Sequence, residues 1–447
     1  MNRSVPNRNG VLFCLLSIAL GFATAFGGSK AEVSKPEVPE IVKLRERVSA
    51  AARERRAEEA YEKKDIEIAP WVEDAAPPNP DNAALLYYQA FLLRPEPNMA
   101  INKKIHNILF DTGPDRQIRT YLGHCLPMME MAEIASRIPQ CTWGVWQGRE
   151  LSLLSKRALD SQVSYLWQIL MVDARTLAAD GHYRAALERC LTLRRLARHL
   201  SEDPRLDLAA RNPDFMALRT IQHVLGVMPP DADILTWFRG RLAVVKGLRL
   251  SFAQMLQAKS ISFFYLMRTN PGTVSHLRNL LVERAEDEIA KEKLRNLTDD
   301  QLLLRTREGF PHLVDLIVQV ADSEMTYEQK CAQMQSFINK LTEADGIDPV
   351  AKCAIFVSDT RGMIERQYPF LVGHAAHING IKAAVEVYLV VAKTGRLPEK
   401  LPDHLPKDPF TGQDFVYEIT DEGFALRCQG KEFLRRKNRF LEFKVKR

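Results

Sequence analysis

Two histidines on one predicted helix are the side chains in this sequence that are best placed for chemistry. His374 and His377 stand three residues apart, with Glu365 upstream and Glu386 downstream. Residues three apart lie on the same face of a helix, so both imidazoles could bind one metal ion. The pattern is not HExxH, and no third ligand follows at a recognisable spacing. We therefore expect histidines that are either hydrogen-bonded within the protein or exposed, and that are dispensable for folding. A secreted hydrolase, metal-dependent or not, with its site near His374 and His377 is the alternative.

Motifs for other reaction classes are missing from the sequence. It contains neither GxGxxG nor GxxxxGK[ST], whose backbone N–H groups cradle phosphates, and no GxSxG turn for a nucleophilic serine. It also has no CxxC pair of the kind found in redox centres and zinc ribbons. We nominate no catalytic residue and no cofactor, and whether the protein is an enzyme stays open.

The net charge of +6 resides in the last 17 residues. Residues 431–447 carry eight Lys or Arg against two Glu, so the rest of the chain is balanced. Such a tail could contact anionic lipid or an acidic protein surface. However, Leu441, Phe443 and Val445 alternate with charged residues, which favours an edge strand with a solvated face.

The N-terminus has the layout of a secretory signal. Arg3 and Arg8 precede an apolar run over residues 11–26, and small residues follow it. We expect cleavage after Ala25 or Ala31, because the run is shorter than the ~20 residues of a comfortable membrane span. A retained anchor is the alternative. The mature protein is then expected in the periplasm or cell envelope, where nucleic acid is not an expected partner.

Export permits disulfides, and six cysteines remain after Cys14 is removed. If Cys331 and Cys353 lie on antiparallel helices that turn near residues 344–348, their positions along the helix axes differ by roughly 10 Å. This exceeds the ~7 Å Cα separation that a bridge allows. We expect buried free thiols.

The order of apolar residues predicts a mainly α-helical fold. After the signal peptide (1–31), residues 32–80 read as a charged leader helix and a proline-rich linker. Residues 81–394 show apolar positions recurring at three and four, in segments separated by Pro, Gly or Asp, which predicts an irregular array of antiparallel helical hairpins. The expected helices are Ala83–Leu93, Val163–Ala178, Tyr183–Leu200, Ile234–Val245, Leu248–Met267, Val274–Leu294, Phe310–Ala321, Tyr327–Thr342, Val350–Arg366 and Ala375–Ala392.

Strand signals occur only in residues 395–447. The Leu-Pro pairs from Leu397 disfavour helix, and Asp421-Glu422-Gly423 reads as a turn between strands 415–419 and 424–428. A two-stranded hairpin is marginal alone, so we expect this small antiparallel β module to pack on the helix Ile378–Ala392.

Two segments resemble known families. Residues 178–204, with Gly181-His182-Tyr183, Ala186-Leu187 and Asp203-Pro204, resemble one tetratricopeptide helix pair. The C-terminal segment contains Tyr388, Gly395-Arg396-Leu397-Pro398, Leu405-Pro406-Lys407-Asp408-Pro409-Phe410, Gly412, Phe415-Val416-Tyr417 and Gly423-Phe424-Ala425-Leu426. With these residues it resembles the globular part of G-type pseudopilins of type II secretion, and many uncharacterised exported bacterial proteins end similarly.

The pseudopilin resemblance covers about 60 residues of the 447. The helix before the β module is internal rather than an N-terminal stem, and Gln429-Gly430-Lys431-Glu432 stands where the calcium loop of those proteins would lie. We therefore carry over neither a calcium site nor a filament role. The sequence favours an exported envelope structural or interaction protein that binds one or more envelope protein partners.

Overall fold

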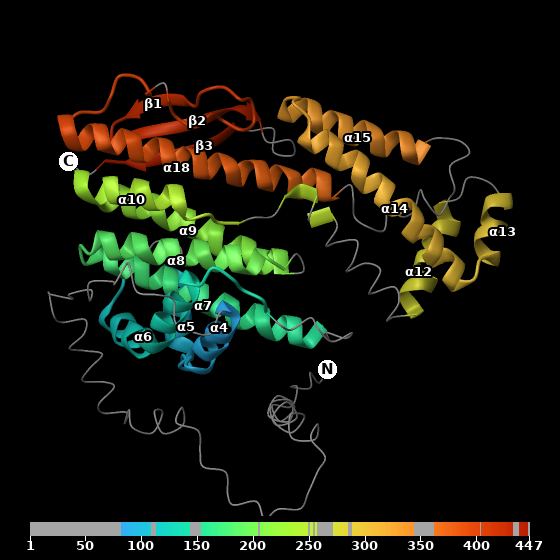
Figure 1. Cartoon of the computed structure of the whole chain (residues 1–447), viewed down its shortest axis with the longest axis horizontal. Helices are drawn as coiled ribbons and strands as arrows, with labels where there is room; N and C mark the ends of the chain where they lie inside the picture. Colours follow the sequence, from blue (N-terminus) through green and yellow to red (C-terminus); the bar gives the residue numbers. More distant parts are fainter. Residues whose placement is uncertain are drawn as a thin grey trace, which may run out of the picture. The chain divides into compact units, whose positions relative to one another are not determined.

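The computed structural model describes residues 82–108, 113–143, 153–203, 206–248, 251–253, 255–256, 271–284, 288–343, 362–402, 404–431 and 438–445 (Figure 1). The chain divides into the units Met1–Arg53 and Glu54–Arg447, and every described residue belongs to the second. The expected signal peptide (1–31), leader helix and linker (32–80) lie outside the described residues.

The described residues form a mainly α-helical fold with one small antiparallel sheet near the C-terminus, which confirms the predicted fold class. Its elements are α4 (Ala83–Leu92), α5 (Met99–Ile108), α6 (Arg116–Arg137), α7 (Leu153–Ala179), α8 (Tyr183–Ser201), α9 (Asp207–Val227), α10 (Ala232–Val244), α12 (Pro271–Arg284), α13 (Glu288–Asn296), α14 (Asp299–Asp322), α15 (Tyr327–Glu343), the π-helical turn η2 (Met363–Gln367), α18 (Tyr368–Thr394), β1 (Val416–Thr420), β2 (Gly423–Lys431) and β3 (Asn438–Lys444).

The turn between α7 and α8 has the geometry expected for a short helical hairpin. The N–H of His182 donates to Leu177 O at 2.8 Å, and the N–H of Gly181 donates to Ala178 O at 3.2 Å. Gly181 has a positive φ of 85°, which a glycine adopts without steric cost. The antiparallel pair predicted here is therefore present, and its kinship with tetratricopeptide repeats stays a prediction.

Two long helices, α6 and α9, were not among the helices expected from the sequence. Each has a proline inside it, Pro127 and Pro213, and an internal proline removes a hydrogen-bond donor. Burial on one face outweighs that cost. The segment Val274–Leu294, expected as one helix, overlaps two helices, α12 and α13. Helix α14 starts well before the expected Phe310, at a Thr298–Gln301 capping box. Most of Leu248–Met267 and Val350–Arg366 lies outside the described residues.

Two hydrophobic clusters form the core, and α8 contributes to both. Leu187, Cys190 and Leu191 join the cluster that continues through α9, α10, α18 and the sheet. Leu193, Leu196 and Leu200 join the cluster built on α4, α5, α6 and α7. Helix α8 is therefore buried on opposite sides along its length, and its polar side chains must find partners inside the protein.

The sheet has the order β1-β2-β3 and packs on α18 as predicted. Phe424 of β2 is fully buried between Tyr388 of α18, at a ring-centroid distance of 5.5 Å, and Phe443 of β3, at 5.1 Å. Leu441 of β3 lies against Gly380 of α18, where an added Cβ would come within 2.4 Å of its Cδ1. Glycine at position 380 thus permits the close approach of helix and sheet.

The C-terminal tail supplies the third strand. In β3 Leu441 and Phe443 are buried while Glu442 and Lys444 are exposed, which confirms the alternation that predicted an edge strand. Helices α9 and α18 hold its outer edge, since Gln222 Nε2 donates to Glu442 O at 2.6 Å and Tyr388 Oη donates to Lys444 O at 2.5 Å.

The buried carboxylate of Asp408 fixes the loop that precedes the sheet. It accepts hydrogen bonds from the backbone N–H groups of Phe410 at 3.0 Å and Gln429 at 2.8 Å, and from Thr411 Oγ1 at 3.1 Å. Leu405 is buried and Leu401 packs on the core, as expected. The β module is therefore continuous with the helical core.

The described cysteines are buried and unbridged, as predicted: Cys125, Cys141, Cys190, Cys331 and Cys428. Cys353 lies outside the described residues.

By length and composition one described helix, Ile364–Thr394, could cross a membrane, and its apolar residues lie in the core.

Candidate functional site

His374 and His377 lie on α18 and face α9, and both are buried, with 5% and 2% of their surface exposed. Nε2 of His374 lies 2.8 Å from Oδ2 of Asp214, and Nε2 of His377 lies 3.3 Å from Oε1 of Gln222. Asp214 and Gln222 are eight residues apart, about 12 Å along the axis of α9. The two imidazoles therefore engage different partners rather than one common point.

Asp214 is the centre of a buried cluster that joins three helices. Nε of Arg194, on α8, donates to its Oδ1 at 2.9 Å, while His374 and the N–H of Leu248, at 3.0 Å, share its Oδ2. Burial alone would raise the pKa of the Asp214 carboxyl. The positive charge of Arg194 and the hydrogen bonds of His374 and Leu248 outweigh burial and hold this pKa well below its usual value. Asp214 is therefore ionised at every physiological pH.

Gly247 closes this cluster on the side of the loop that follows α10. A Cβ at position 247 would lie 2.5 Å from Asp214 Oδ2 and 2.7 Å from Arg194 Nη2. No side chain fits there, and only glycine allows the Leu248 N–H to reach the carboxylate. The Arg194–Asp214–His374 cluster is a packed interior, with no space for a substrate beside Asp214 on this side.

The ring of Phe370 covers the ring of His374. The two rings stack with a centroid distance of 6.1 Å and an interplanar angle of 11°. The guanidinium of Arg211 lies 5.4 Å from the centroid of the Phe370 ring. An Asp–His pair can serve a nucleophile, yet the described contacts of His374 are a carboxylate and a phenyl ring.

Within the described ranges, no group of three or more His, Cys, Asp or Glu side chains could hold a metal ion. Of the two glutamates that flank the histidines in sequence, Glu386 pairs with Arg239 at 3.4 Å, at the far end of α18. The spacing of His374 and His377 thus leads to two separate protein partners. The expectation that His374 is dispensable for folding stays a prediction, and the place of this residue in a buried ion cluster argues against it.

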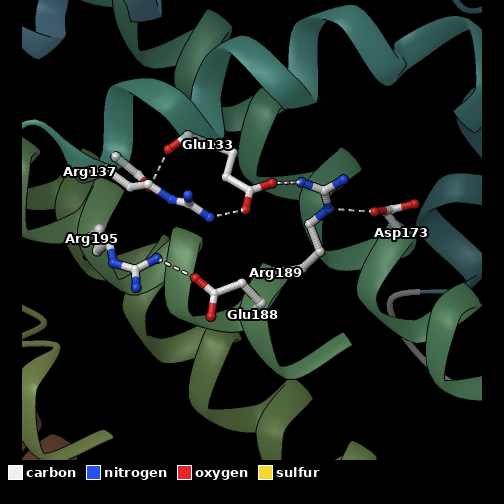
Figure 2. Close-up of polar contacts among 7 residues, drawn as sticks. Glu133, Arg137, Asp173, Glu188, Arg189 and Arg195 are labelled. Carbon is white, nitrogen blue, oxygen red and sulfur yellow. Dashed lines mark hydrogen bonds and ion pairs between the residues drawn. The ribbon is translucent and has the colours of Figure 1, made fainter. Parts of the chain in front are cut away.

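A second buried network joins α6, α7 and α8 and involves residues that the sequence did not single out (Figure 2). Arg189 of α8 bridges two carboxylates, donating from Nη1 to Glu133 of α6 at 2.5 Å and from Nε to Asp173 of α7 at 2.8 Å. Arg137 donates to the other oxygen of Glu133 at 2.9 Å, and Arg195 pairs with Glu188 at 2.8 Å. This network fixes α8 against its two neighbours.

Burial raises the pKa of the Glu133 carboxyl, and the positive charges of Arg189 and Arg137 offset part of this rise. The sequence did carry one signal for this residue. Glu133 follows Met129 and Ala132 on the apolar face of α6, where all three side chains are buried. A charged residue on a buried face requires a partner, but the sequence does not indicate which one.

A third polar contact holds α4 to the end of α8. Tyr87 Oη lies 3.1 Å from Nδ1 of His199, Trp143 Nε1 donates to His199 O at 3.0 Å, and the rings of Tyr87 and Trp143 stack at 5.4 Å. Burial lowers the pKa of His199 to about 4, so the imidazole is neutral at pH 7.

In all three places, side chains of types common in active sites pair with one another between helices. Comparison with known proteins adds no relative, because no family model, no curated protein and no solved structure matches this chain.

Proposed function

We propose that this protein is an exported structural and interaction protein of the cell envelope, whose helical array serves as a scaffold for an envelope protein partner. One observation carries the proposal. His374, the side chain that the sequence placed best for chemistry, is instead part of the buried Arg194–Asp214–His374 cluster, which connects α8, α9 and α18. A catalytic histidine must reach the proton it transfers, whereas only 5% of the surface of His374 is exposed.

The physical role of such clusters supports a scaffold. Desolvating two charges costs several kcal/mol per ion, roughly what their mutual attraction returns, so a buried ion pair adds little net stability. Removing one partner is costly, because it leaves an uncompensated charge in the interior. The cluster at Asp214 and the network at Glu133 therefore select one arrangement of the helices against others.

The N-terminal sequence supports the compartment. The order of Arg3, Arg8, the apolar run 11–26 and Ala25 is typical of a secretory signal. The resemblance of residues 388–426 to the pseudopilin globular part agrees with an envelope location. Nucleic acid is not a proposed partner, because export removes the protein from it.

The basic tail takes part in the fold as well as in any contact. One of its cations, Lys444 of β3, pairs with Glu422 at 2.7 Å. Anionic lipid or an acidic protein surface is the proposed contact of the remaining positive charge in residues 431–447.

Recovery of the native protein from the envelope tests the proposal. Its intact mass should show the loss of about 25 to 31 N-terminal residues, and crosslinking in intact cells should give one stoichiometric complex with an envelope protein. The His374→Gln variant should lower the unfolding temperature without changing metal content. A cytoplasmic protein that retains Met1, or a metal that is lost in His374→Gln at unchanged stability, contradicts the proposal.

A further inference from the structure

Strand β1 is an edge strand whose outer side is open. The sheet has the order β1-β2-β3, and no strand in the described ranges pairs with the other side of β1 (Figure 1). The opposite edge of the sheet, on β3, is covered, because Gln222 and Tyr388 donate to backbone carbonyl groups of that strand. An edge with unused backbone groups is a template for another strand.

The geometry of the β1–β2 hairpin identifies the backbone groups that point away from the sheet. Thr420 and Gly423 flank a two-residue loop and therefore form a hydrogen-bonded pair. Hydrogen-bonded and non-hydrogen-bonded pairs alternate along an antiparallel ladder, so Ile419 and Tyr417 do not exchange hydrogen bonds with β2. Their N–H and C=O groups point outward, and among the described residues neither has a backbone–backbone hydrogen bond outside the sheet.

The side chain of Ile419 lacks cover on the same side. Ile419 lies opposite Phe424, so both residues are on the face of the sheet that packs on α18. Phe424 is fully buried, whereas Ile419 is 57% exposed, and Tyr417 on the same face is half-buried. The apolar face of the sheet therefore extends beyond the cover that α18 provides, and a further strand beside β1 would continue it.

A second copy of β1 fits this edge in one antiparallel register. A two-fold axis at Glu418 places Tyr417 opposite Ile419 of the second copy, and Ile419 opposite Tyr417 of the second copy. These are the residues whose backbone groups point outward, so each pair exchanges two N–H···O bonds. Aromatic and β-branched side chains also form favourable cross-strand pairs. A register displaced by two residues makes only half of these bonds within the strand.

The charges at the axis are compatible with this register. Glu418 faces Glu418 of the second copy, and like charges directly opposite one another destabilise a sheet. However, Nη2 of Arg427 lies 2.7 Å from Oε1 of Glu418, so each carboxylate brings its own cation to the axis. The four charged groups that meet there sum to zero.

We propose that two copies of the protein associate through β1 and join their three-stranded sheets into one continuous antiparallel sheet. The dimer is reversible, because a strand of five residues on each side gives an interface at the small end of the known range. This proposal is independent of the compartment and of the envelope partner.

Disulfide trapping in the full-length chain tests the register. A Glu418→Cys thiol meets the thiol of the second copy at the axis, in a non-hydrogen-bonded pair whose Cα atoms are about 4.5 Å apart, which a bridge allows. Thr420→Cys is the matched control, since this exposed residue is on the same strand and face but roughly 14 Å from its own copy. Under mild oxidation, with the rate of the parent chain subtracted, we expect a covalent dimer to form about tenfold faster at 418 than at 420.

Ile419→Pro tests whether backbone hydrogen bonds hold the dimer. Proline at position 419 removes an N–H that points outward, so the β1–β2 hairpin keeps its hydrogen bonds while the dimer loses two. In the Glu418→Cys background it should lower the rate at 418 to the rate at 420. An unchanged circular dichroism spectrum and unfolding temperature show that the variant is folded. Should proline unfold the hairpin, the contrast between positions 418 and 420 decides alone.

Three outcomes overturn the proposal. Equal rates of dimer formation at 418 and 420 show that β1 does not pair with itself about Glu418. A rate at 418 that Ile419→Pro leaves unchanged in a folded chain shows that the strand edge does not make the contact. Oxidation in intact cells that joins position 418 to a different protein, with no covalent homodimer, assigns the edge to a strand of that protein.

Discussion

Asp214 accepts hydrogen bonds from Arg194 of α8 and His374 of α18 at 2.9 and 2.8 Å, so one buried carboxylate on α9 fixes the positions of two other helices. The carboxylate is fully buried and both partners are almost fully buried. A one-turn slip of α18 along α9 moves His374 by about 5.4 Å and separates it from Asp214. The cluster therefore favours one register.

The tight contact at Gly247 predicts a large effect from one methyl group. Gly247→Ala should lower the free energy of unfolding by about 1–3 kcal/mol, because the added Cβ meets Asp214 and Arg194 at distances that real Cβ atoms do not adopt. Urea unfolding measures the change.

Gly240→Ala is the matched control for Gly247→Ala. Gly240 lies within α10, is exposed and has no atom within 4 Å of an added Cβ. Alanine is the better helix former, so this variant should gain about 0.5–1 kcal/mol. Equal effects of the two substitutions would rule out the tight packing described for Gly247.

The buried ring of Phe424 should stabilise helix and sheet together. Phe424→Ala should cost about 3–5 kcal/mol, since the ring fills the space between Tyr388 and Phe443. Hydrogen exchange should show residues 385–391 of α18 losing protection together with β2.

Ile419 provides the comparison, because it pairs with Phe424 across β1 and β2 and is 57% exposed. Ile419→Ala should cost less than about 1 kcal/mol. Cleavage of residues 396–447 by mild proteolysis, leaving a core of unchanged stability, would show that the β module is autonomous.

His199 should make stability depend on pH between about 6.5 and 4. Burial lowers its pKa to about 4 in the folded protein, whereas the unfolded chain binds a proton near pH 6.5. The unfolded state therefore holds more protons in this window, and stability falls as the pH falls, by up to about 3 kcal/mol.

Urea unfolding at pH 7 and pH 4.5 measures the contribution of His199. His199→Gln should flatten the profile in this window, whereas Tyr87→Phe, which removes a hydrogen-bond partner and keeps the burial, should retain the slope. An equal slope in His199→Gln and the parent would show that the histidine does not titrate differently on folding.

The spacing of apolar residues predicted the fold correctly where that spacing alone determines whether a segment is a helix or a strand. The pair α7 and α8 and the alternation of Leu441 and Phe443 in β3 are of this kind, because burial of one face fixes each structure. The prolines at 127 and 213 obscured α6 and α9, since local chemistry disfavours a proline in a helix and only tertiary packing reverses that preference.

The candidate site could be predicted less well, because its partners are distant in sequence. His374 and His377 share a helix face, and this local rule suggested a common ligand. Their partners, Asp214 and Gln222, are about 160 residues away, and the side chain of a single residue does not indicate which distant helix it will meet. The same holds for Glu133 and Arg189.

The stability of Asp214→Asn tests most directly whether the buried cluster is structural. The substitution removes the charge that Arg194 and His374 face in the interior, and we expect a loss of about 3–5 kcal/mol in urea unfolding. Asp414→Asn, the same change in an exposed pair with Lys407 at 2.5 Å, should cost less than about 1 kcal/mol. An Asp214→Asn protein as stable as the parent, with a bound metal or a hydrolytic activity lost instead, would contradict the scaffold proposal and assign the cluster to catalysis.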